Sequence, residues 1–281
     1  MAKTEVRAPA KVNIGLFVTG KRQDGFHNIE TIFYPVTLSD IIRIEDFDGF
    51  HFSSSDESIA EKSTNLIVKA KNLLEEYSGE KLNFRIYLEK NIPIGAGLGG
   101  GSSDAAAVLI ELNEFAGLNL SMHEISDLAI RLGSDVPFFL NPKPSFAEGR
   151  GEILHPLIVH IELPIVIVNP GISISTAWAY SKIQSKPAPF SLRNIESFDM
   201  YHLKIFNDKI QNDFENLVFD NYPKIKEIKM LHYKMGAVFA LMSGSGSTVF
   251  GIYPDMETAQ AAARIMKEEN YFVFVHNDGI K

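Results

Sequence analysis

Cysteine is absent from the 281 residues of this chain. Its absence excludes disulfide bonds, thiolate metal ligands and cysteine nucleophiles. Long apolar runs are missing too, because segments such as LPIVIV are far shorter than the ~20 residues needed to cross a bilayer. The N-terminal segment shows no apolar core followed by a cleavage site. We therefore expect a cytoplasmic protein with no membrane partner.

A surplus of basic residues is also lacking. The chain has 27 Lys and Arg against 35 Asp and Glu, which gives a net charge of −8. This balance argues against a nucleic-acid partner, but a local positive site can still bind a phosphorylated small molecule. Hydrophobic residues at 45% and charged residues at 22% are typical of a globular protein. The length is sufficient for two domains.

The character of the sequence changes near residue 155, which predicts one domain over 1–155 and a second over 156–281. The second domain is predicted to contain, in order, a strand at 155–171, helical stretches at 200–219 and 224–234, a hairpin at 237–253, a helix from residue 255 and a strand at 271–277. This order predicts an α+β domain with a largely antiparallel sheet.

Two helices of the first domain carry clear start and stop signals. Residues 63–65 begin one helix, which ends at Gly79. Ser121 and Glu124 form a capping box for another helix, which ends at Gly133. Apolar residues predict strands at 5–18, 29–36, 40–47 and 82–88.

The segment PIGAGLGGGSS at 93–103 joins the last of these strands to a helical stretch that runs to Phe115. It holds five glycines and two serines. Glycines let several backbone N–H groups point at one ligand. The following helix adds the positive end of its dipole, which favours anions. The loop therefore predicts a phosphate-binding site.

The sequence of this segment matches the known phosphate-binding motifs to different degrees. Gly95, Gly97 and Gly100 satisfy G-x-G-x-x-G, but a dinucleotide site needs a second strand with an acidic end. A helix over 121–132 follows instead. A Walker A loop fails because no Gly-Lys-Ser or Gly-Lys-Thr is present, and the H-R-D and D-F-G signatures of protein kinases are absent too.

PIGAGLGGGSSDAA resembles the second motif of the GHMP kinases, the family of galactokinase, homoserine kinase, mevalonate kinase and phosphomevalonate kinase. APAKVNIGL at 8–16 resembles the first motif, and LMSGSGSTVFGIY at 241–253 the third. The resemblance covers nearly the whole chain. It implies an α+β protein with the GHMP kinase fold, which is an α/β structure of two domains. The N-terminal domain would be ribosomal-protein-S5-domain-2-like and the C-terminal domain ferredoxin-like, with the active site in the cleft.

Other segments narrow the resemblance, namely KRQDGFHNIETIF, GSDVPFF, FAEGRGE and QNDFEN. They are similar to GHMP kinases of isoprenoid biosynthesis that phosphorylate the 2-hydroxyl of a cytidine diphosphate-linked methylerythritol. The resemblance implies a small-molecule kinase that uses ATP and Mg²⁺ and is a monomer or weak homodimer. The residues it implies for ATP binding are Pro93, Ile94, Gly95, Ala96, Gly97, Leu98, Gly99, Gly100, Gly101, Ser102 and Ser103.

The first motif and GSDVPFF supply the candidate catalytic residues. Lys11 and Asn13 alternate with apolar residues, so their side chains share one face of the strand. Asp135 follows a helix, and Pro137 is expected to hold Val136 extended, on a stiff turn beside apolar surface. Such a carboxylate suits a general base. The resemblance implies that Lys11 is catalytic, that Asp135 takes the proton of the attacking hydroxyl, and that Asn13 binds substrate.

The resemblance also implies a cytidine site. His27 can hydrogen-bond a base edge, and Phe26 can stack on cytosine where the family usually has tyrosine. Tyr180 matches the second stacking aromatic, but Trp178, the single tryptophan, lies two residues away and is an alternative.

The third motif is expected to close over the substrate phosphates, with Gly244 and Ser245 as binding residues. The eight histidines show no paired ligand spacing, so we expect no structural zinc. Three rival functions remain. A GHMP kinase for another alcohol, such as homoserine or mevalonate, would not need a base-stacking site. A nucleotide-binding regulator without activity would not need Lys11 and Asp135, and an oxidoreductase would need the missing second strand.

Overall fold

The computed structural model describes residues 3–59, 63–195 and 197–277. The chain forms two compact units, and each takes segments from several parts of the sequence. Unit 1 comprises Met1–Ala10, Leu38–Ile92 and Gly99–Pro142, and unit 2 comprises Lys11–Thr37, Pro93–Leu98 and Lys143–Lys281. The long strands β1 (Lys3–Lys21) and β2 (His27–Asp46) each contribute to both units. The compact units are therefore interleaved along the chain, and the domain boundary near residue 155 stays a prediction.

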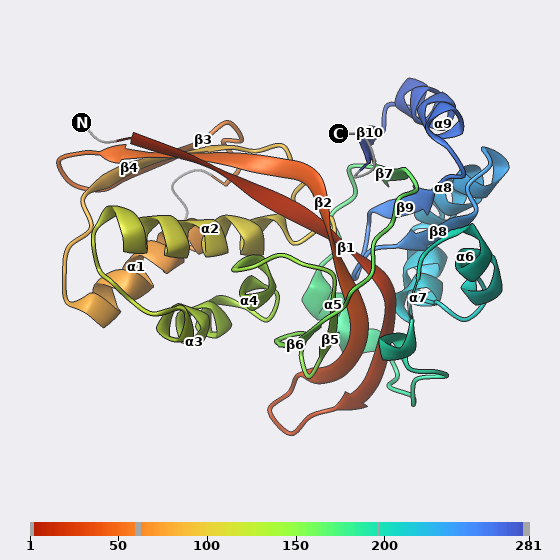
Figure 1. Cartoon of the computed structure of the whole chain (residues 1–281), viewed down its shortest axis with the longest axis horizontal. Coiled ribbons are helices and arrows are strands. Elements are labelled where there is room, and N and C mark those ends of the chain that lie inside the picture. The colour runs from red at the N-terminus through yellow and green to blue at the C-terminus, as the bar shows by residue number, and fades with distance from the viewer. Residues whose placement is uncertain (1–2, 60–62, 196, 278–281) are drawn as a thin grey trace. The chain divides into compact units, whose positions relative to one another are not determined.

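In the residues that the structure describes, unit 1 combines strands of one sheet with four helices. Strand β4 (Phe84–Glu89) pairs antiparallel with the end of β2 and parallel with β3 (His51–Ser54). The strands lie over α1 (Leu66–Ser78) and α2 (Gly100–Phe115), as Figure 1 shows in orange and yellow. The remaining helices are α3 (Met122–Leu132) and α4 (Val136–Phe139). Along β4, Phe84, Ile86 and Leu88 are buried in alternation, as the sequence predicted.

Local signals place two of these helices correctly. The Asn65 side chain accepts a hydrogen bond from the Ile67 N–H at the start of α1, and Gly79 ends this helix in the left-handed conformation. Ser121 and Glu124 form the predicted capping box of α3. Both predictions are confirmed.

Two local predictions are wrong. The strands predicted at 29–36 and 40–47 are one strand, β2, because the alternation of buried and exposed residues continues between them. Val136 is helical rather than extended, since α4 begins there with Pro137 in its first turn. Proline lacks only an N–H that the first helical turn does not use. Burial of Phe138 and Phe139 accompanies this turn.

Unit 2 is built on a sheet in the order β10-β7-β9-β8, in which all pairs are antiparallel. Its strands are β7 (Ile165–Asn169), β8 (Phe239–Met242), β9 (Val249–Ile252) and β10 (Phe272–His276). Strands β5 (Ser145–Glu148) and β6 (Ile153–Pro156) pair antiparallel with each other, and β5 pairs antiparallel with β2. The helices are α5 (Thr176–Lys182), α6 (Met200–Phe206), α7 (Phe214–Asn221), α8 (Pro223–Lys234) and α9 (Met256–Glu268), with a 3₁₀ turn at Leu192–Asn194. The predicted α+β character is confirmed.

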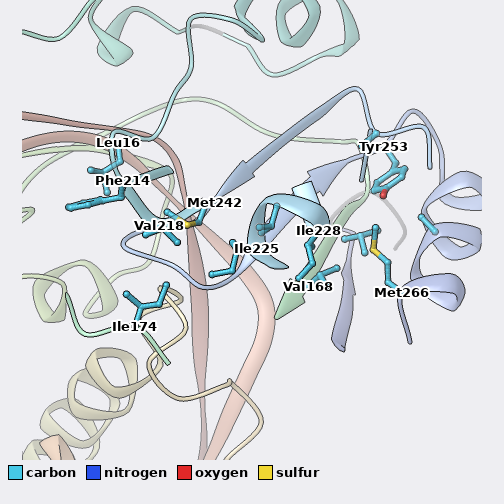
Figure 2. Packing of buried hydrophobic residues seen from close by; sticks show 14 of the residues in the cluster. Leu16, Val168, Ile174, Phe214, Val218, Ile225, Ile228, Met242, Tyr253 and Met266 are labelled. Carbon is cyan, nitrogen blue, oxygen red and sulfur yellow. The ribbon is translucent and has the colours of Figure 1, made fainter. Parts of the chain in front are cut away.

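The core of unit 2 fills the space between this sheet and its helices. Figure 2 shows Val168 of β7 near Ile228 of α8, and Phe214 and Val218 of α7 near Leu16 of β1. These residues are buried.

The helices in the described part of the chain include none with the length and apolar character of a membrane span.

Candidate active site

Lys11 and Asn13 meet on β1, in unit 2. Both are buried, with 4% and 1% of their surface exposed. The Lys11 ammonium donates to Asn13 Oδ1, approaches the Gly97 carbonyl at 3.4 Å, and lies 4.9 Å from the centre of the Phe33 ring. Asn13 Nδ2 donates to Thr31 Oγ1 at 2.9 Å. A buried cation is thus held in a fixed orientation by oxygen atoms and a ring face.

The glycine loop contacts both other motifs within unit 2. Ser243 Oγ donates to the Gly97 carbonyl at 2.9 Å and accepts from the Asn13 N–H at 3.1 Å. The Thr248 N–H donates to the Ala96 carbonyl at 3.2 Å. The first, second and third motifs therefore share one hydrogen-bond network, although they lie far apart in the sequence.

Two positions of the loop require glycine, because other parts of the protein approach their backbone closely. Gly95 and Gly97 have φ angles of +63° and +78°. A Cβ on Gly97 would lie 2.2 Å from the Ser243 carbonyl oxygen, and one on Gly95 would lie 2.6 Å from Ser173 Oγ. Ala96 and Leu98 are buried. Ile94 is 44% exposed, and Pro93 begins the segment.

The loop continues in unit 1 as the start of α2. Gly99 is the N-cap, with φ +72° and no side-chain cap. Helix N-terminal N–H groups without a cap are available to an anion. Ser103 is 1% exposed, and its Oγ has no hydrogen-bond partner among the described residues. An acceptor such as a phosphate oxygen would satisfy this hydroxyl. Ser102 precedes it, and Gly100 and Gly101 form the first helical positions.

Asp135 lies in unit 1, immediately before α4, with helical backbone angles of φ −83° and ψ −16°. It is half-buried, and the apolar residues Val136, Phe138 and Phe139 that follow are buried. Asp135 thus precedes a buried apolar segment, as the sequence indicated, but this segment is a short helix instead of an extended turn. Lys11 belongs to the other unit.

His27 and Tyr180 come together in unit 2. Their ring centres are 5.3 Å apart with an interplanar angle of 32°, and Tyr180 also packs edge-on against Phe214 at 4.9 Å. Burial lowers the pKa of His27, with a smaller contribution from the charge of Lys21, so the ring is neutral at physiological pH. Trp178 instead packs edge-on against Tyr222 at 5.9 Å.

Phe26, next to His27 in the chain, presents an exposed aromatic side chain. It is 50% exposed, and the Arg150 guanidinium lies 4.7 Å from its ring centre. This cation–π contact holds the ring without covering it completely. Exposed aromatic faces of this kind suit stacking on a planar base.

The third motif is held by a residue whose role the sequence did not reveal. Asn212 Nδ2 donates to the carbonyls of Met242 and Gly244, both at 2.7 Å, and the Asn212 side chain is buried. Ser245 is also buried, and its hydroxyl lies 3.1 Å from that of Thr176. Asn212 belongs to the segment QNDFEN, which contributes to the family resemblance. Its contact with the third motif could not be predicted from the sequence.

No group of three or more His, Asp or Glu side chains in the described ranges is arranged to hold a metal ion.

Family models match both halves of the chain. The model described as GHMP kinases N terminal domain matches residues 65–142, and the model described as GHMP kinases C terminal matches residues 195–271. The chain belongs to the GHMP kinase family. The predicted fold class and the predicted enzyme class, a small-molecule kinase, are confirmed.

Individual relatives agree with the narrower resemblance. A protein of Chlorobium phaeobacteroides (strain BS1) named 4-diphosphocytidyl-2-C-methyl-D-erythritol kinase is 40% identical over 272 residues, which cover 95% of each chain. A crystal structure of 4-(cytidine 5'-diphospho)-2C-methyl-D-erythritol kinase is 34% identical with a TM-score of 0.82, covering 98% of this chain and 100% of that one. A mevalonate kinase structure has a TM-score of 0.71 at 16% identity, over 99% of this chain and 100% of its own, and shares the fold alone.

Proposed function

We propose that this kinase transfers the terminal phosphate of ATP to the 2-hydroxyl of 4-diphosphocytidyl-2-C-methyl-D-erythritol, in the non-mevalonate isoprenoid pathway. The observation that carries the proposal is 40% identity over 95% of both chains to a relative with that name. A kinase for another alcohol, such as homoserine or mevalonate, is the alternative. The mevalonate kinase likeness, at 16% identity, supports only the fold.

The proposed ATP site is the glycine loop, with Pro93, Ile94, Gly95, Ala96, Gly97, Leu98, Gly99, Gly100, Gly101, Ser102 and Ser103. The uncapped start of α2 and the unpartnered Ser103 hydroxyl support it. Backbone N–H groups would bind the phosphates, and the Ser103 hydroxyl would donate one further hydrogen bond. Mg²⁺ bound to the nucleotide would neutralise phosphate charge.

Lys11 and Asp135 are the proposed catalytic residues. Phosphoryl transfer depends mainly on positioning and charge neutralisation. Asp135 would accept the proton of the 2-hydroxyl, and Lys11 would stabilise the developing negative charge on that oxygen. The fixed orientation of the Lys11 ammonium beside Asn13 supports its part, and the position of Asp135 at the start of the short helix α4 supports its part. Asn13 would bind the substrate next to Lys11.

The cytidine moiety would bind at Phe26, His27 and Tyr180. Of the two aromatics on α5, Tyr180 is the better candidate because its ring lies beside that of His27, whereas Trp178 packs against Tyr222. The backbone of Gly244 and the Ser245 hydroxyl would approach the substrate phosphates. The cytoplasmic location and the monomeric or weakly dimeric state stay predictions from the sequence.

A panel of acceptors tests the proposed function. ADP release would be followed with ATP and, separately, the cytidyl substrate, homoserine, galactose and mevalonate. We expect rapid ADP release with the cytidyl substrate and only background release with the other three. Faster release with homoserine or mevalonate than with the cytidyl substrate would establish the alternative.

A further inference from the structure

Lys90, Asp40 and Asp104 form a buried charged cluster in unit 1, which we call the Lys90 triad. Their side chains are 7%, 0% and 5% exposed. The Lys90 ammonium donates to Asp40 Oδ2 and, at 3.1 Å, to Asp104 Oδ2. The three residues come from different elements: Asp40 from β2, Lys90 from the end of β4, and Asp104 from α2.

The triad connects the segment that enters the glycine loop to the helix that leaves it. The second oxygen of Asp40 accepts the N–H groups of Asn91 and Ile92, at 2.6 and 2.8 Å. These residues directly precede the loop. Asp104 lies on α2, directly after the loop. Charge-assisted hydrogen bonds in a buried site are strong and directional, so the triad fixes both flanks of the loop.

Gly100, the first residue of α2, leaves space for the Lys90 side chain. A Cβ at Gly100 would lie 2.9 Å from the Lys90 ammonium and 3.0 Å from Ile92 Cγ2. At the adjacent Gly101, the nearest atom to a Cβ would be Leu66 Cδ1, at the ordinary contact distance of 3.7 Å. The missing side chain of Gly100 therefore admits the ammonium against the first turn of the helix.

The surroundings of Asp104 favour the protonated form of its carboxyl group. Burial raises the pKa of Asp104 to about 8; the negative charge of Asp40 adds to this rise, and Lys90 opposes it. Asp104 therefore carries a proton near neutral pH. An ionised carboxylate this close to the start of α2 would weaken the attraction of the helix for phosphate, and a protonated one does not.

Further charged groups lie on the helices that pack against α2. Among the helices that pack on α2, α1 adds a buried ion pair between Lys71 and Glu75 at 3.0 Å. The buried residues of α3 and α4 are all apolar, and Asp135 precedes α4. Lys90 and Asp40 are the groups in contact with the Asp104 carboxyl.

We propose that Lys90 is a positioning residue of this kinase: held between Asp40 and Asp104, it fixes the start of α2 in the orientation that binds the triphosphate of ATP. The proposal rests on the proposed ATP site and acts through the two aspartates. It adds to that site a residue outside the glycine loop. It also gives Gly100 a role in packing, separate from the roles of Gly95 and Gly97.

The first test is Lys90→Met, which keeps the length of the side chain and removes its charge. The dissociation constant of a non-hydrolysable ATP analogue would be measured by calorimetry without any acceptor. We expect it to rise about tenfold to a hundredfold, with little change in KM for the cytidyl substrate. Lys81→Met is the matched control, because Lys81 is 84% exposed in the same unit, and it should change neither value. A folded Lys90→Met protein with unchanged nucleotide affinity would overturn the proposal.

Asp104→Asn is the second test, and it applies even if Lys90→Met does not fold. Asparagine can keep the hydrogen bond to Lys90 and is permanently neutral. In the unmodified enzyme, nucleotide affinity should fall as the pH rises through about 8. In Asp104→Asn this fall should be absent, with near-normal affinity at neutral pH. The same pH dependence in both proteins would contradict the proposal. Because the affinity measurements in both tests use nucleotide alone, their outcome does not depend on which alcohol is phosphorylated.

Discussion

The carbonyl oxygen of Ser243 lies 2.2 Å from the position that a Cβ on Gly97 would occupy. This contact brings the backbone of the third motif against the backbone of the glycine loop. Gly97 is also in the left-handed region, with φ +78°. Two separate constraints, conformation and space, therefore require glycine at this position.

Gly97→Ala should destabilise the protein strongly, because backbone on both sides prevents relief of the clash. We expect a loss of about 3 kcal/mol or more in the free energy of unfolding, measured by urea denaturation. Gly171→Ala is the matched control, since Gly171 has φ +74° and nothing within 4 Å of a Cβ. It should cost about 1 kcal/mol from backbone strain alone. An equal loss of unfolding free energy in the two variants would show that the close contact with Ser243 does not affect stability.

Asp135→Asn should remove most turnover while leaving ATP binding intact, because the amide cannot accept the proton of the hydroxyl. We expect a fall in kcat of about a hundredfold or more, with an unchanged dissociation constant for the ATP analogue. Asp127→Asn is the control: Asp127 is on α3 of the same unit, and its side chain is 66% exposed. Near-normal kcat in Asp135→Asn would remove this residue from the proposed mechanism.

Tyr180 and Trp178 can be separated by their effects on KM. Tyr180→Leu should raise KM for the cytidyl substrate roughly tenfold or more, through lost stacking on the base, and should leave KM for ATP unchanged. Trp178→Leu should have a much smaller effect, because the Trp178 ring packs against Tyr222. The reverse ranking would assign the stacking role to Trp178.

His232 should make the protein sensitive to acid. It is fully buried on α8, and its Nδ1 lies 3.0 Å from the Tyr253 hydroxyl. Burial lowers the pKa of His232 to about 3. The unfolded chain binds this proton near pH 6.5 and the folded chain does not, so stability present above that pH is lost as the pH falls. The loss should approach about 1.4 kcal/mol per pH unit between about pH 6 and pH 3.

Urea denaturation over this pH range compares the unmodified chain with His232→Gln, which keeps a partner for the Tyr253 hydroxyl. The variant should lose the part of the pH dependence that His232 contributes. His123→Gln, at a side chain that is 87% exposed, should retain it. An unchanged slope in His232→Gln would show that His232 is already protonated in the folded state.

Elements with local signals were predictable from the sequence. Asn65 and Gly79 delimit α1 because each acts on backbone groups within one turn of itself. The loop glycines likewise indicated backbone crowding before any contact was known. The α+β order of the second half followed from its periodicity, and β10-β7-β9-β8 is antiparallel as expected.

Features that depend on distant residues were not predictable. The pattern around Pro137 favoured an extended Val136, yet the segment is helical, which shows that tertiary packing can override a local preference. Lys90 and Asp40 are ordinary charged residues in the sequence, 50 positions apart, and only the fold buries them together. The contact of Asn212 with the third motif is hidden for the same reason.

The most direct test of the proposed function is phosphorus NMR of the reaction products. After incubation with ATP, Mg²⁺ and 4-diphosphocytidyl-2-C-methyl-D-erythritol, we expect one new phosphomonoester signal on the 2-oxygen, in equal amount to ADP, with the diphosphate signals of the substrate retained. Unchanged substrate beside hydrolysed ATP, or phosphate on another hydroxyl, would contradict the proposal.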